Sequence, residues 1–282
     1  MIADLICSTC STDADVEAVG RAEDGRIQVR CTRCGGEWTR GRATERRVDH
    51  HPVLPTLEQL RERFPGPGDV EPARLARVEQ LKHEFLERVQ PHPDPAVARH
   101  WATYQQIFSA DGPVRASPAD LKAFANIRLG AHPGNMSVFN RAWNELGDSD
   151  AADKLRGVIE YLLRGPRDVP LEDRLTTLIT DRDAGMKGFR ESLLTKVLCV
   201  VEDREYLPIL TYTSPASAGK REVAQDVWGL ALPDPHRVTW TIGRLIVWSN
   251  RLLLVLAGDG FATVHHAAKF LWWAKDRDIR AR

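Results

Sequence analysis

Four cysteines near the N-terminus limit what the first part of this chain can fold into. They form two Cys-x2-Cys pairs, Cys7 with Cys10 and Cys31 with Cys34, with twenty residues between the pairs. This spacing suits a tetrahedral site in which four thiolates hold one zinc ion. We expect all four cysteines to bind a structural Zn²⁺ ion with no open coordination position.

The segment around the second pair, residues 25–40, adds to the zinc prediction. It alternates apolar and polar residues before Cys31, provides Gly35 and Gly36 for a tight turn, and resumes a strand pattern at Trp38. The pattern resembles a zinc ribbon, in which short antiparallel strands present two cysteine pairs to one ion. Two disulfides, or an iron site of the rubredoxin type, would use similar pairs and stay open as alternatives.

The other sequence features favour a metal over disulfides. The fifth cysteine, Cys199, lies in the apolar run 193–201, where a buried and inert thiol is expected. The start of the chain, Met1-Ile-Ala-Asp4, lacks the basic residues and long apolar segment of a secretory signal. The apolar stretch 245–257 is interrupted by polar residues, which argues against a membrane span. We therefore expect a cytoplasmic protein with no membrane partner, in a compartment that keeps thiols reduced.

Charge is balanced over the whole chain but not within it. The sequence has 39 Lys+Arg and 39 Asp+Glu, so no overall charge indicates nucleic acid. Residues 21–47 nevertheless contain eight arginines against four acidic residues. Arginine forks bind phosphate oxygens and guanine edges better than lysine does, although an arginine-rich soluble surface is the simpler interpretation. The residues predicted to contact phosphate here are Arg26, Arg30, Arg33, Arg40 and Arg42.

The sequence divides into a cysteine-rich segment, a connector and a helical body. We place a zinc ribbon at residues 1–42, a linker at 43–54 and an all-α domain at 55–282, with a further boundary near 91–95. The body is expected to be helical because its apolar residues recur at helical spacing and its strand signals are weak. The predicted fold class is mainly α, with a small β zinc ribbon at the N-terminus.

Local signals place most of the helices. Ser117 followed by Pro118 reads as an N-cap and a first helical position, and Thr56 with Gln59 has the form of a capping box. Helices are expected over about residues 75–89, 96–108, 118–124, 155–163, 171–179, 189–201, 223–230, 239–257 and 261–275.

The sequence of the body contains no recognised catalytic motif, so a binding role is favoured over an enzymatic one. The nearest approach to a phosphate-binding loop is 214–221, where Ser214 and Arg221 replace the first glycine and the final Ser/Thr of a Walker A motif. The body cations predicted to extend the phosphate contact from helix starts and loops are Lys187, Arg190, Lys220 and Arg221.

Three other groups allow both a functional and a structural interpretation. His265 and His266 point about 100° apart on a helix, so one is expected to flank the core and the other to face solvent. Five tryptophans could either pack in the core or form a surface that stacks on unpaired bases, and we favour the core. They are Trp228, Trp240, Trp248, Trp272 and Trp273. The residues Asn126, His132, Asn135, Arg141 and Trp143 could belong to a polar loop between helices or to an active site without a recognised motif, and the polar loop is favoured.

A stretch of the body resembles a helical module of bacterial restriction systems. The residues that carry the likeness are Phe108-Ser-Ala-Asp-Gly112, Ser117-Pro-Ala-Asp-Leu-Lys-Ala-Phe124, Leu155-Arg-Gly-Val-Ile-Glu-Tyr-Leu-Leu163, Pro170-Leu-Glu-Asp-Arg-Leu175, Met186-Lys-Gly-Phe-Arg-Glu-Ser-Leu-Leu-Thr-Lys-Val-Leu198 and Glu205-Tyr-Leu-Pro-Ile209. The module precedes the AAA+ motor in proteins similar to the methylcytosine-specific restriction ATPases, and the likeness covers about residues 105–230. It implies a recognition or adaptor protein that contacts DNA and works with a separate motor or nuclease subunit.

Two functions follow from the sequence. The leading one is a zinc-binding nucleic-acid-recognition or adaptor protein of a bacterial restriction-like defence system, without its own motor. The alternative is a protein–protein interaction module with a structural zinc ribbon and no nucleic-acid role, which the net charge of +0 supports. A continuous arginine surface would favour the first, and scattered arginines would favour the second.

Overall fold

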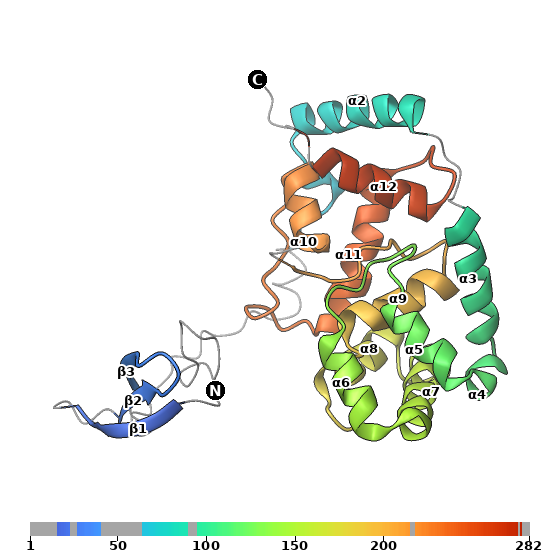
Figure 1. The fold of residues 1–282 in the computed structure, drawn as a ribbon. Helices are drawn as coiled ribbons and strands as arrows, with labels where there is room; N and C mark the ends of the chain where they lie inside the picture. Colours follow the sequence, from blue (N-terminus) through green and yellow to red (C-terminus); the bar gives the residue numbers. More distant parts are fainter. Residues whose placement is uncertain are drawn as a thin grey trace. The chain divides into compact units, whose positions relative to one another are not determined.

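The computed structural model describes residues 16–22, 27–40, 64–89, 95–214, 218–275 and 277. The chain divides into two compact units, Met1–Leu54 and Pro55–Arg282 (Figure 1). The described part is mostly helical and holds one small antiparallel sheet, which confirms the mainly α character. The predicted capping box at 56–59 lies outside the described residues.

The first unit contains a three-stranded antiparallel sheet in the order β1-β2-β3. The strands are β1 (Val16–Arg21), β2 (Ile27–Cys31) and β3 (Glu37–Arg40). In β2, Val29 and Cys31 alternate with Gln28 and Arg30, and the period of two puts the apolar pair on one face. Val29 and Cys31 are the buried residues of this strand, and Val29 pairs with Trp38 of β3.

The second unit is built of helices packed around one apolar core. In chain order they are η2 (Pro67–Asp69), α2 (Pro72–Arg88), α3 (Pro95–Ile107), α4 (Gly112–Arg115), α5 (Pro118–Asn126), α6 (Ser137–Leu146), α7 (Asp148–Arg164), α8 (Leu171–Thr180), α9 (Glu191–Val201), α10 (Lys220–Val223), η3 (Ala224–Trp228), α11 (Ile242–Ala257) and α12 (Val264–Lys275). Helix α2 packs on α12 at one end of this unit, and α5, α6 and α7 contact one another at the other end (Figure 1). Helix α9 is buried over most of its length, which confirms the predicted central helix.

The structure confirms the predicted cap at Ser117 and adds one at Thr241 that the sequence analysis did not name. The Ser117 hydroxyl accepts a hydrogen bond from the Asp120 backbone N–H at 3.1 Å, with Pro118 at the first helical position of α5. Thr241 caps α11 in the same way, because its hydroxyl accepts from the Arg244 N–H at 3.5 Å. Each cap satisfies a backbone donor that the helix itself leaves without an acceptor.

Helices α8 and α11 meet at backbone distance. A Cβ atom on Gly243 would lie 1.9 Å from the carbonyl oxygen of Glu172, so no larger residue fits there. The Gly243 N–H also donates to the Thr176 hydroxyl at 3.2 Å. The absence of a side chain on α11 therefore sets the spacing of these two helices.

Of the polar cluster predicted between helices, His132 and Asn135 do lie in the loop between α5 and α6, but the rest of the prediction is corrected by the structure. Residues 137–146 form α6, and Trp143 is fully buried, with its indole N–H donating to the Asp148 carboxylate at 2.6 Å. Asn126 and Asn140 exchange two side-chain hydrogen bonds, at 2.9 and 2.8 Å. Trp143 is thus a core residue, and Asn126 ties α5 to α6.

The longest apolar stretch of the sequence forms α11, whose polar residues are used inside the unit. The Asn250 amide oxygen accepts from the Leu207 N–H at 2.9 Å, and its NH₂ group donates to the Glu205 carbonyl at 2.6 Å. These bonds attach α11 to the segment that follows α9. Within the described ranges, we find no helix that combines the length and the apolar character needed to cross a membrane.

Candidate nucleic-acid interface

The second cysteine pair lies in the turn between β2 and β3. The Cys31 N–H donates to the Gly36 carbonyl at 2.9 Å, and the Gly35 N–H donates to the Cys31 carbonyl at 2.8 Å. Gly35 has a φ of +73°, a conformation that favours glycine over residues with a Cβ atom. This tight turn brings Cys31 and Cys34 to the same end of the hairpin, as two thiolate ligands of one ion require.

The first cysteine pair, Cys7 and Cys10, lies outside the described residues. Cys31 is buried and Cys34 is exposed. In the part of the chain that the structure describes, no three His, Cys, Asp or Glu side chains gather as a metal site would require. A zinc site therefore remains a prediction that depends on the first pair.

The arginines predicted to contact phosphate in the first unit differ in their surroundings. Arg30 forms an ion pair with Glu37 across the β2–β3 pair, with Nη2 and Oε1 2.5 Å apart. Arg33 is exposed in the turn, and Arg40 ends β3. Arg26 and Arg42 lie outside the described residues.

Three of the four predicted cations of the helical unit are used inside it. One Arg190 nitrogen donates to the carbonyls of Leu178, Ile179 and Asp181 at 2.8–2.9 Å, and therefore caps the end of α8. The Arg221 Nε donates to the Leu232 carbonyl at 3.0 Å. Lys187 is the exposed member of the set.

The prediction that Lys220 contacts phosphate is wrong for this fold. Its side chain is fully buried, and its Nζ donates to the Ile209 carbonyl. Burial lowers the pKa of Lys220 to about 8. A lysine that enters the core at the first residue of α10 is not accessible to a strand of nucleic acid.

A carboxylate organises the loop that precedes Lys220. The Glu222 carboxylate accepts hydrogen bonds from the Thr213 hydroxyl at 2.5 Å, the Ser214 N–H at 2.9 Å and the Gly219 N–H at 2.6 Å. Desolvation raises the pKa of Glu222, but these hydrogen bonds outweigh it, so the pKa lies below its ordinary value. Glu222 therefore holds the two ends of this loop together.

The adjacent histidines of α12 take different positions: one flanks the core as predicted, but the other is half-buried against α3 and does not face solvent as expected. His266 is 3 % exposed and packs between the rings of Phe85 and Phe261, at centroid distances of 5.1 and 5.6 Å. Desolvation lowers its pKa, so the neutral ring is favoured. His265 is half-buried and stands edge-on to Trp101, with centroids 5.4 Å apart at 89°.

The five tryptophans all pack in or against the core, as expected, but to different depths. Trp228 is buried, whereas Trp240 and Trp248 are partly exposed and pack with Phe64, whose ring centroid lies 4.3 and 4.9 Å from theirs. We call Phe64, Trp240 and Trp248 the aromatic patch. Trp272 and Trp273 of α12 are half-buried at the edge of the core.

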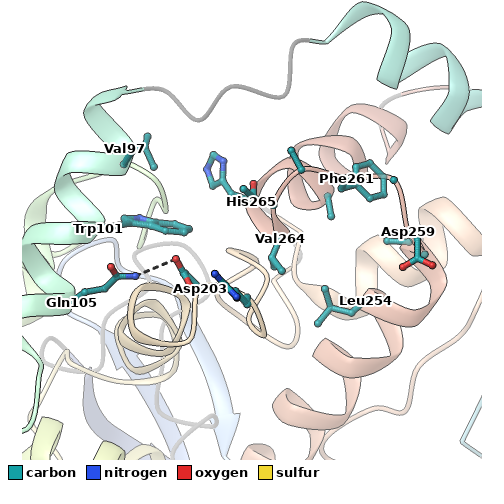
Figure 2. Close-up of a pocket in the computed structure, with 17 residues that line it drawn as sticks. Val97, Trp101, Gln105, Asp203, Leu254, Asp259, Phe261, Val264 and His265 are labelled. Atoms are coloured by element: carbon teal, nitrogen blue, oxygen red, sulfur yellow. Dashed lines mark hydrogen bonds between the residues drawn. The ribbon is translucent and has the colours of Figure 1, made fainter.

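Two adjoining cavities of the helical unit form a cleft beside α3 and α12. The first, here the aromatic basin, has a volume of about 590 Å³ and lies between α3 and the α11–α12 segment. Figure 2 shows Trp101 and Gln105 of α3 on one side of it, near Asp203 and His265, with Leu254 and Phe261 on the other. The second, here the basic basin, has a volume of about 660 Å³. Val97 and His265 line both basins, so the two basins meet at these residues.

The two basins differ in charge. The basic basin is lined by Arg128, His132, His265 and Lys269, and none of its described lining residues is Asp or Glu. Three hydroxyl side chains, those of Ser192, Thr211 and Ser214, complete its polar surface. The aromatic basin instead carries two carboxylates, Asp203 and Asp259, besides Arg204. An anion is therefore favoured in the basic basin.

The loop that carries Arg128 is attached to the core at its start and contains a local hydrogen bond near its end. The Nζ of Lys196 donates to the carbonyls of Phe124, at 2.8 Å, and Ile127. The Gly134 N–H donates to the His132 Nδ1 at 3.0 Å. Burial lowers the pKa of Lys196 to about 8.

Gly130 in the middle of this loop lies close to α3. Its φ is +74°, and a Cβ atom there would lie 2.4 Å from Nε1 of Trp101. That nitrogen is buried and has no hydrogen-bond partner among the described residues. Any side chain at Gly130 would therefore push the loop away from α3 and change the shape of the basic basin.

Sequence analysis missed Arg128 and Lys269. The segment Arg128-Leu-Gly-Ala-His-Pro-Gly134 did offer a signal, because two glycines flank a histidine close to an arginine. Lys269 offered no such signal, since it is a single lysine in a helix about 140 residues after Arg128 in the chain. Only the fold brings these two cations to one cavity.

Comparison with protein-family models, with curated proteins and with solved structures finds no match to this chain. The likeness of residues 105–230 to a restriction-system module stays a prediction from the sequence. What the protein does must therefore follow from its own residues.

Proposed function

We propose that this protein is a cytoplasmic zinc-binding nucleic-acid-recognition or adaptor protein that serves a separate motor or nuclease subunit in a restriction-like defence system. The observation that carries the proposal is the basic basin, whose lining joins Arg128 and Lys269 with no described carboxylate. Cations without competing acids, together with hydroxyl donors, are the groups that bind phosphate oxygens in protein–DNA interfaces.

The zinc part of the proposal rests on the cysteine pairs. Cys31 and Cys34 occupy one tight turn, and Cys7 with Cys10 would supply the other two thiolates. A site with four protein ligands leaves no position for a substrate, so the metal stabilises the first unit and does no chemistry. One zinc ion per chain, measured by metal analysis of the purified protein, is the expected content.

The test is binding of the zinc-loaded protein to labelled single-stranded and duplex DNA, unmodified and cytosine-methylated, over a range of salt concentration. We expect affinity to fall steeply with salt, by roughly one unit of logarithmic slope for each phosphate that the protein neutralises. Lys269→Gln should weaken binding and reduce the slope, whereas Lys154→Gln, an exposed lysine of α7 outside the cleft, should do neither. The absence of binding at low salt would contradict the proposal.

A second function, a protein–protein interaction module, has one observation in its favour. The aromatic patch lines an apolar hollow that extends to Val255, a residue of α11 that is 64 % exposed. Exposed apolar surface of this kind often marks a contact between proteins. If the zinc-loaded protein binds no DNA, and Val255→Glu abolishes capture of a co-encoded motor or nuclease subunit, this function replaces the first.

A further inference from the structure

The cleft offers two chemically different compartments that meet at Val97 and His265. Their volumes, about 590 and 660 Å³, each fall within the range of about 300–1,000 Å³ that is usual for ligand sites. One compartment has rings and hydrogen-bond acceptors, and the other has cations. A ligand that fills both must join a flat polar ring to an anion.

The basic basin suits a phosphate group. Arg128 comes from the loop after α5 and Lys269 from α12, so two separate elements present positive charge to the same space. An arginine fork can hold two phosphate oxygens, and the hydroxyls of Ser192 and Thr211 add donors. Charge-assisted hydrogen bonds of this type are the stronger ones in proteins.

The aromatic basin suits a planar base with an amino group. Trp101, Phe261 and His265 contribute ring surface to its walls. The Gln105 NH₂ group is already used, because it donates to the Val200 carbonyl at 2.9 Å and to the Asp203 carboxylate at 3.2 Å. The groups that Gln105 and Asp203 have left to face a ligand are oxygen acceptors, which pair with an N–H donor, while Arg204 beside them supplies donors for a ring nitrogen.

We infer that the cleft binds one nucleotide unit, with its phosphate in the basic basin and its base in the aromatic basin. The exocyclic amino group of the base points toward Gln105 and Asp203, and the sugar lies beside Val97 and His265, where the two basins meet. A free mononucleotide and an unpaired nucleotide of a strand present the same chemistry. The strand as the source rests on the proposed function.

The experiment is calorimetric titration of the zinc-loaded full chain with AMP, IMP and ribose 5-phosphate. AMP and IMP differ in an amino group against an oxo group, so their comparison probes the acceptors of Gln105 and Asp203. We expect AMP to bind roughly tenfold more tightly than IMP, since the oxo group leaves an acceptor of the protein without a donor. Ribose 5-phosphate, which has no base, should bind more weakly than both.

Matched variants test each basin. Ala98→Trp places a large ring at an exposed position that lines the aromatic basin, and Ala102→Trp makes the same change one turn later on α3, outside the cleft lining. We expect the first to abolish AMP binding and the second to leave it unchanged. Lys269→Gln should weaken AMP about tenfold while Lys154→Gln should not, and this pair keeps the test decisive if Ala98→Trp misfolds.

The outcomes separate this inference from the proposed function. Equal binding of AMP and ribose 5-phosphate, or AMP binding that survives both Ala98→Trp and Lys269→Gln, overturns the inference. Equal binding of AMP and IMP overturns the orientation of the base. Single-stranded DNA that binds wild type and both cleft variants alike overturns the inference and removes the basic basin as the DNA site, but leaves nucleic-acid binding by the protein standing. AMP binding that depends on the cleft, with no DNA binding, supports the inference and overturns the proposed function.

Discussion

The two units of the chain are stabilised in different ways. In the described part of the first unit, the buried apolar side chains are Val29 and Cys31. The second unit buries a continuous core that runs from Val70 to Ala274 and includes every long helix. A small sheet with so little apolar surface needs a disulfide, a metal or a partner, whereas the helical unit can fold on its core alone. The comparison teaches that the proposed zinc ion is a folding element for one unit only.

Metal removal is expected to have the largest effect, and it tests whether zinc stabilises the first unit alone. A chelator, or Cys31→Ser, should unfold the first unit, because binding of structural zinc contributes on the order of 10 kcal/mol to small zinc domains. The helical unit should keep its melting temperature and its helical circular dichroism. The measurement is amide hydrogen exchange, which reads both units in one sample. Loss of protection in both units would contradict the separation.

The fifth cysteine provides the matched control. Cys199 is buried in α9, and its thiol donates to the Leu207 carbonyl at 3.2 Å. Cys199→Ser should leave the zinc content at one ion per chain and lower only the stability of the helical unit. A change in zinc content would show that Cys199 belongs to the metal site after all.

A buried lysine, Lys196, makes the stability of the helical unit depend on pH. The folded-state pKa of Lys196 is about 8, below the ordinary 10.5, so between these values the folded chain has released a proton that the unfolded chain retains. Its contribution to stability is therefore present above pH 10.5 and is lost as the pH falls toward 8. We expect the unfolding free energy of wild type minus that of Lys196→Met to rise by up to about 3 kcal/mol over this window. Urea melts at several pH values measure it, and a flat difference would contradict the prediction.

Helix packing gives a smaller effect, confined to the helical unit. Gly243→Ala should destabilise it by about 1–3 kcal/mol, because the new methyl group would meet the Glu172 carbonyl of α8. Gly157→Ala in α7 is the control, since a Cβ atom there meets nothing within 4 Å. It should stabilise the same unit by about 1 kcal/mol through helix propensity. Thermal melts of the two variants should therefore move in opposite directions.

The smallest predicted effect belongs to a single cap. Ser117→Ala removes the acceptor for the Asp120 N–H at the start of α5 and should cost about 1 kcal/mol. Ser117→Asn keeps a neutral acceptor at this position and should stay near wild type. Chemical denaturation of the helical unit resolves the two variants. An equal loss of stability in both would show that the hydroxyl does more than cap the helix.

Local signals account for what could be predicted of the fold. The helices α5, α7, α9 and α11 were predicted because caps, glycines and apolar spacing lie within each segment. Helix α6 was missed because its apolar residues, Phe139 and Trp143, alternate with asparagines that suggest a loop. The sequence pattern also shows nothing of its tie to Asn126, which forms only in the folded chain.

The candidate site was less predictable for a physical reason. The walls of the cleft come from the 128–134 loop, from Thr211, Ser214 and Ala218, and from α12, which lie far apart along the chain. Lys220 was assigned to the surface because a sequence cannot distinguish a solvated lysine from one whose amine reaches the Ile209 carbonyl. Of the predicted histidines, His132 and His265 both prove to line the basic basin, although no short motif joins them.

The Lys196 contact with the carbonyls of Phe124 and Ile127 has a consequence for binding kinetics. It fixes the chain just before Arg128 from inside the core, so this wall of the basic basin is preorganised before any ligand arrives. Ordering a loop at the moment of association would cost conformational entropy, and little of that cost remains here. Ligand capture should then proceed in one step, with a rate that rises linearly with ligand concentration and shows no plateau from a slow closure of this wall.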